Sequence, residues 1–78
     1  MPTIKGVPGP VRLFFYSFDC NEPMHVHAER EQMSCKYWIR PVLLASNDGF
    51  GVRELGRIRA LIHENAGRIR KAWNEHCR

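Results

Sequence analysis

The sequence predicts an α+β fold, in which a small antiparallel sheet of three to four strands packs against one long C-terminal helix. A stripe of apolar residues at helical spacing fills the last third of the chain and places the helix at about residues 52–75. Segments with strand-like alternation precede it within residues 3–40, and turn-forming residues occupy positions 46–50. A chain of 78 residues suffices for one small domain, so residues 1–78 are expected to form a single unit.

The strands are predicted from side-chain alternation. Residues 11–18 are rich in aromatic and β-branched side chains on both faces, which is typical of a central strand. Residues 24–29 alternate between apolar and polar side chains, and residues 33–40 repeat this pattern as far as Pro41. Residues 3–5 are expected to add a short edge strand.

The C-terminal helix is predicted from apolar residues that recur at steps of three and four. They are Leu55, Ile58, Ile62, Ala66, Ile69, Trp73 and Cys77. Such a stripe covers one face of a helix and is expected to pack on the sheet. Gly67 lies off the stripe and costs about 1 kcal/mol relative to alanine, so we expect one helix that bends there at most.

Composition narrows the classes of protein to which the chain can belong. The longest apolar run, residues 42–45, is far shorter than the roughly 20 residues of a membrane span. Cys20, Cys35 and Cys77 form no close pair, so neither a disulfide framework nor a zinc ribbon is predicted. The N-terminus lacks the apolar core of a secretory signal. We therefore expect a cytoplasmic protein that makes no contact with a membrane.

The basic residues are unevenly distributed. The whole formal net charge of +4 falls in the segment from residue 52 onward. This excess favours an acidic partner, either a protein or a nucleic acid, and a solvated helix face explains it equally well. Arg57, Arg68 and Lys71 lie away from the apolar stripe and are the expected contacts with a nucleic acid or a partner.

A His-x-His pair offers the clearest chemistry. Strand alternation places His25, His27 and Glu29 on one face, at successive spacings of about 6.6 Å. Two imidazoles that titrate near neutral pH can act as base and acid in a ribonuclease-like reaction. In that hypothesis Lys36 or Arg40 would hold the phosphate.

The same residues also suit a metal ion. His25 and His27 would supply two ligands to a divalent metal, and Glu29 is the strand-borne candidate for the third. Cys35, His63 and His76 are further candidates for that position. Two histidines and a glutamate on the solvated face of a strand can also be without a function. No cofactor other than such a metal ion is expected.

Taken in order, many short motifs resemble the bacterial domain-of-unknown-function family number 4160. The clearest are Met1-Pro2-Thr3-Ile4, Phe14-Phe15-Tyr16-Ser17, Asn21-Glu22-Pro23, His25-Val26-His27, Lys36-Tyr37-Trp38-Ile39 and Ala72-Trp73-Asn74-Glu75-His76. The resemblance implies a small single domain, of a kind often encoded beside another small domain in what looks like a toxin–antitoxin pair. The family pattern includes both histidines of the His-x-His motif.

We therefore expect a toxin-like component of a two-component bacterial module that cuts RNA with His25 and His27. The alternatives are a non-catalytic module that binds a partner protein or nucleic acid, and a metal-binding domain. The expected partner is a small antitoxin-like protein encoded nearby, and a homodimer is compatible with the sequence.

Overall fold

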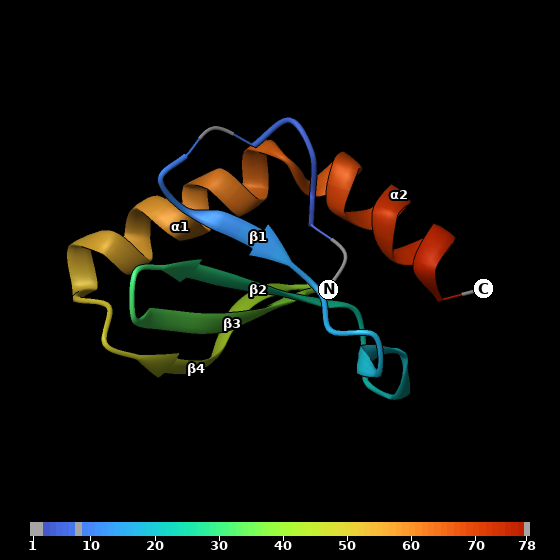
Figure 1. The fold of residues 1–78 in the computed structure, drawn as a ribbon, viewed down its shortest axis with the longest axis horizontal. Helices are drawn as coiled ribbons and strands as arrows, with labels where there is room; N and C mark the ends of the chain where they lie inside the picture. Colours follow the sequence, from blue (N-terminus) through green and yellow to red (C-terminus); the bar gives the residue numbers. More distant parts are fainter. Residues whose placement is uncertain (1–2, 8, 78) are drawn as a thin grey trace.

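A computed structural model describes residues 3–7 and 9–77 of the chain. Within these residues four strands form one antiparallel sheet in the order β1-β2-β3-β4, and two helices lie on the same side of it (Figure 1). The elements are β1 (Arg12–Phe14), the 3-10 segment η1 (Asp19–Asn21), β2 (His25–Arg30), β3 (Met33–Ile39), β4 (Val42–Asp48), α1 (Val52–Glu64) and α2 (Ala66–His76). The α+β class is confirmed.

The prediction of one long helix was wrong, because the helical region divides at Asn65. The backbone amide of Asn65 bonds to the carbonyls of both Leu61 and Ile62, which closes α1. Its side-chain amide donates a second bond to the Leu61 carbonyl, at 2.8 Å. Asparagine competes in this way for backbone groups, and this favours a helix end over a helix interior. The apolar stripe keeps its phase across the break, so Ile62 and Ile69 are both fully buried.

The sheet extends beyond the range predicted for its strands. Residues 42–48 form β4, which pairs with β3 and occupies much of the region predicted to be a turn. At the other end, β1 has three residues and is the outermost named strand, not a central one. Its outer edge is covered by Thr3, which forms an isolated bridge with Phe14, and by the Ile4 amide, which bonds to the Leu13 carbonyl.

The inner face of the sheet and the helices enclose the core. From the sheet come Leu13, Val26, Ala28, Cys35, Tyr37, Ile39 and Val42, and from the helices come Ile58, Ile62, Ile69 and Trp73. The Tyr37 hydroxyl donates a hydrogen bond to the Leu55 carbonyl, at 3.0 Å, so even the polar atom of this core residue is partnered. The predicted helix stripe therefore packs on the sheet as expected.

A disulfide joins two distant parts of the chain at the end of the sheet where β2 begins. Cys20 of η1 is joined to Cys77, which follows α2. The sequence had indicated no disulfide framework, and this interpretation is corrected by the Cys20–Cys77 bond. Cys35 keeps a free thiol, buried in the core. The two half-cystines lie 57 positions apart, which is why no local spacing indicated the bond. Among the described residues no helix is long and apolar enough to cross a membrane.

Candidate functional site

The outer face of the sheet carries a cluster of two imidazoles and one carboxylate, which we call the Asp19 cluster. It consists of Asp19, His25 and His27, whose ligand-type atoms all lie within 4.8 Å of one another. Asp19 comes from η1, at the end of the loop that follows β1, and its side chain is 4% exposed. The backbone amide of Tyr16 donates a hydrogen bond of 2.7 Å to Asp19 Oδ2 and fixes the carboxylate in place.

His25 is the most enclosed member of the cluster. Its side chain has no exposed surface, and its ring packs edge-on against the rings of Trp38 and Trp73. Nδ1 lies 2.8 Å from the Pro23 carbonyl oxygen and therefore donates a hydrogen bond to it. Nε2 lies 3.1 Å from Asp19 Oδ2 and makes no hydrogen bond with the described residues.

His27 is the member that reaches the surface. Its side chain is 16% exposed, and Nε2 lies 3.0 Å from Asp19 Oδ2. Its ring lies between Phe14, with which it stacks at 5.4 Å, and Tyr16, which it meets edge-on at 4.7 Å between centroids. The aromatic rings and Asp19 together fix the orientation of the imidazole.

The surroundings of the Asp19 cluster set the protonation of two of its members. Burial disfavours the charged form of Asp19, but the Tyr16 amide and the two imidazoles stabilise the carboxylate more, and the pKa of Asp19 lies below its ordinary value. Burial is the largest influence on His27 and, opposed by the Asp19 carboxylate, leaves the pKa of His27 below its ordinary value. A carboxylate and a neutral imidazole are the forms that bind metal ions.

Glu29, which the sequence offered as the third metal ligand, has a different partner. Its carboxylate accepts a hydrogen bond of 3.1 Å from Arg12 Nε and a second from Arg12 Nη2. The Arg12–Glu29 pair lies two register positions from the Phe14–His27 pair. Asp19 therefore takes the place that was predicted for Glu29. Asp19 was not identified from the sequence, because it lies six positions before His25 and only the folded loop brings it back to the strand.

The comparisons with known proteins place the chain in a family. A family model with the description "Domain of unknown function (DUF4160)" matches residues 11–74. The chain belongs to this family. Neither the search of curated proteins nor the search of solved structures gave a match. The matched segment of the DUF4160 domain contains all three members of the Asp19 cluster.

The two residues predicted to hold a phosphate lie at different distances from the cluster. In the DUF4160 domain Lys36 is the register partner of His27 across β2 and β3. Its ammonium group contacts the Glu22 carboxylate and lies 4.4 Å above the ring of Trp38. Arg40 follows the end of β3 and lines a surface hollow with Trp38 and Trp73. Only Lys36 adjoins a member of the cluster.

The basic residues of the helices do not join the cluster either. Arg57 of α1 lines a hollow between α1 and the segment before β1. Arg68 and Lys71 of α2 line another hollow, beside residues 3–5, and Arg68 Nη1 donates a hydrogen bond of 2.9 Å to the Gly6 carbonyl. The three positive charges are therefore divided between two surfaces of the domain.

Proposed function

We propose that this DUF4160 domain binds one divalent transition-metal ion of the zinc class through Asp19, His25 and His27. The observation that carries the proposal is the state of His25. Because Nδ1 donates its proton to the Pro23 carbonyl, a neutral His25 keeps a bare lone pair on Nε2, which is buried without a hydrogen bond and lies 3.1 Å from Asp19 Oδ2. Two buried acceptors 3.1 Å apart repel each other, and a metal ion bound by both would remove that repulsion.

The geometry of the Asp19 cluster resembles that of a metal site. Asp19 Oδ2 lies 3.0 and 3.1 Å from the two histidine nitrogens. Ligand atoms that each lie about 2.0–2.2 Å from one zinc ion are separated by roughly 3–3.5 Å. Metal-bound histidines usually donate their other ring proton to a carbonyl or a carboxylate, as His25 does to Pro23.

The donor set and its surroundings indicate which ion would bind and in what role. Two imidazoles and one carboxylate suit zinc and its neighbours in the transition series better than calcium or magnesium, which prefer oxygen ligands. Phe14, Tyr16 and Trp73 enclose the cluster. A metal ion held there would link the loop before β2 to the sheet, and so stabilise this end of the domain.

The test is zinc titration of the oxidised, metal-free protein, followed by calorimetry and thermal unfolding. One equivalent should bind, and free zinc at a hundred times the Kd should add about 2.7 kcal/mol to the free energy of unfolding. Asp19→Asn keeps the shape of the side chain and removes its charge. It should weaken binding by more than the roughly 10–100-fold that loss of an outer-shell partner costs.

Glu29→Gln is the matched control, because it makes the same change at the other candidate carboxylate. It should leave zinc affinity unchanged. If the folded parent takes up no zinc, the proposal fails. Equal loss of affinity in the two variants would mean that Asp19 is not a specific ligand, and would also overturn the proposal.

A second function, RNA cleavage by a toxin-like component of a two-component module, is supported by the position of His27. This imidazole is partly exposed, is oriented by Asp19 and faces Lys36 on the next strand. His25 does not support a two-histidine reaction, because neither of its ring nitrogens faces solvent.

This second function is tested by expression in a bacterium with and without the product of the adjacent gene. The parent should arrest growth and cleave RNA, and a small antitoxin-like partner should relieve both effects. His27→Gln should abolish them, and His63→Gln, on the exposed side of α1, should not. Arrest that persists in His27→Gln would exclude His27 as the catalytic group.

A further inference from the structure

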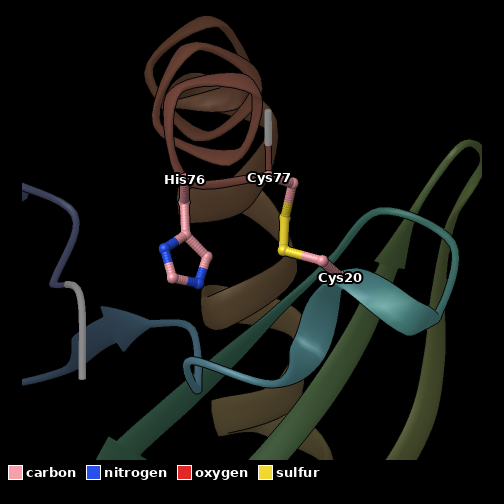
Figure 2. A group of neighbouring side chains, drawn as sticks. All are labelled: Cys20, His76 and Cys77. Atoms are coloured by element: carbon pink, nitrogen blue, oxygen red, sulfur yellow. A yellow bond between two sulfur atoms is a disulfide. The ribbon is translucent and has the colours of Figure 1, made fainter.

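A second group of metal-ligand side chains lies where the end of α2 meets η1. It consists of Cys20, His76 and Cys77, whose sulfur and nitrogen atoms lie within 4.8 Å of one another. Figure 2 shows His76 and Cys77 side by side at the end of α2 and Cys20 reaching them from η1. We call this group the Cys20 cluster. It shares no residue with the Asp19 cluster.

His76 has no hydrogen-bonding role that accounts for its place in the Cys20 cluster. Its Nε2 is buried and makes no hydrogen bond with the described residues. Its ring lies nearly parallel to Phe15, with 6.2 Å between the centroids. A buried imidazole nitrogen without a partner loses the hydrogen bond that it would make to water. A bound metal ion would satisfy this nitrogen.

We propose that reduction of the Cys20–Cys77 disulfide converts the Cys20 cluster into a metal site that binds a zinc-class ion through two thiolates and His76. In the first step a dithiol reductant donates two electrons and two protons, so that Cys20 and Cys77 become thiols and the reductant becomes a disulfide. In the second step a divalent ion binds both sulfurs and the His76 nitrogen, and the two thiol protons leave to solvent. The disulfide and the metal ion exclude each other, because the same two sulfurs make both.

The cluster should stay together when the disulfide is reduced, because both of its elements are held by other contacts. Asp19, the neighbour of Cys20, is fixed by the Tyr16 amide and by His27. The end of α2 is fixed by the buried side chain of Trp73, whose carbonyl accepts a hydrogen bond from the Cys77 amide. Two thiolates about 2.3 Å from one zinc ion lie within about 4.6 Å of each other, and a ring nitrogen of His76 already lies within 4.8 Å of both sulfurs.

The Cys20–Cys77 disulfide is accessible to a reductant, and the ligands of the reduced cluster favour one class of metal ion. Cys20 is exposed, so a dithiol can attack the disulfide without unfolding the core. Thiolates select zinc-class ions over calcium and magnesium. Three protein ligands leave a fourth position open to water or to a partner's side chain. In the reducing cytoplasm that the sequence predicts, the metal-bound form would be the prevailing one.

The probe for the Cys20 cluster is cobalt, because only thiolate-bound cobalt gives a strong sulfur-to-metal charge-transfer absorption. The protein is reduced with a phosphine, which supplies no competing thiol, and is titrated beside the oxidised protein. The reduced protein should bind one equivalent with this absorption, and the oxidised protein should show none. Reoxidation should expel the ion and abolish the signal.

Three variants assign the ligands and separate this site from the Asp19 cluster. Cys77→Ser should abolish the absorption, and His76→Gln should weaken cobalt affinity by at least about tenfold. Cys35→Ala, which removes the remaining thiol, should leave the absorption intact. Zinc titration of the oxidised protein, in which the disulfide occupies both sulfurs of the Cys20 cluster, tests the Asp19 cluster by itself. Circular dichroism of each reduced variant checks the fold. A folded, reduced parent without the absorption, or a signal that follows Cys35, would overturn the proposal.

Discussion

The two faces of the sheet are packed by different chemistry, although the same strands build both. The inner face holds aliphatic and aromatic side chains under the two helices, with the Tyr37 hydroxyl as a partnered exception. The outer face carries Phe14, Tyr16 and Trp38 around the Asp19 cluster, and Arg12 lies 4.5 Å above the ring of Phe14. The inner face is enclosed by the helices, whereas the outer face is covered by loops and long side chains, and from the helices by Trp73, which packs on His25.

The two faces are therefore expected to contribute differently to the stability of the fold and to the specificity of ligand binding. Apolar contacts on the inner face are non-directional and depend on the volume that they fill. Contacts on the outer face depend on charge and on which nitrogen carries a proton. We therefore expect the inner face to dominate folding and the outer face to carry the ligand chemistry.

The largest effect should come from a cavity on the inner face. Ile62→Ala removes a fully buried side chain from between α1 and the sheet and should lower the free energy of unfolding by about 2–5 kcal/mol. Trp73→Ala should cost about 3–5 kcal/mol, and it also uncovers His25. Urea unfolding measures both changes.

The control for the cavity is Val52→Ala, because Val52 is an apolar residue of α1 that is 89% exposed. Its free energy of unfolding should stay within about 0.5 kcal/mol of the parent. If Ile62→Ala and Val52→Ala unfold at the same urea concentration, the helices do not pack on the inner face as described.

A smaller effect should appear when the inner face is titrated. Burial raises the pKa of the Cys35 thiol from its ordinary value of 9.0 to about 11. Above pH 9 the unfolded chain therefore loses this proton before the folded chain does. The contribution of the Cys35 thiol to the free energy of unfolding is therefore complete below pH 9. It is lost as the pH rises through 11, by up to about 1.4 kcal/mol for each pH unit.

The measurement is urea unfolding of the oxidised protein between pH 8 and pH 11, with Cys35→Ala as the control variant. The variant should lose stability less steeply over this range. Some slope should remain, because burial also raises the pKa of Tyr37. Identical slopes in the two proteins would mean that Cys35 is not held in an apolar environment.

The smallest effect should come from an ion pair at the rim of the outer face. The side chains of Arg12 and Glu29 are 34% and 39% exposed, so water and salt screen their attraction. A double-mutant cycle with Arg12→Gln and Glu29→Gln should give a coupling energy of about 0.2–1 kcal/mol that falls in 1 M salt. A larger coupling energy that does not change with salt would mean that this ion pair is shielded from solvent, as a buried pair is.

Local patterns in the sequence predicted the helical region, but not its division at Asn65, and the inner strands β2 and β3. The alternation of β2 and β3 placed His27 and Lys36 on one face, and the apolar stripe placed Ile58 and Ile62 in the core. By contrast, β4 begins with four apolar residues and ends with three polar ones, so its sequence does not alternate, and Leu43 and Leu44 are both exposed. A pattern method has no signal for such a strand.

The candidate site was predicted in part. The two histidines were identified because they alternate on one strand, but their partners lie on other elements. Asp19 reaches them from a loop, and Cys77 reaches Cys20 from the far end of the chain. Glu29 had the expected spacing and lies on the expected strand, yet Arg12 on the neighbouring strand binds its carboxylate. Only the fold determines such pairings.

The disulfide between η1 and the end of α2 also restricts the unfolded chain. The disulfide closes a loop across a sequence separation of 57 residues, which contains three of the strands and both helices. In the chain-entropy model, a loop of this length restricts the unfolded ensemble by about 4 kcal/mol. A metal ion bound by both cysteines would close the same loop. Oxidised and metal-bound proteins would thus share one tethered topology, and only the reduced, metal-free chain would unfold as an open polymer.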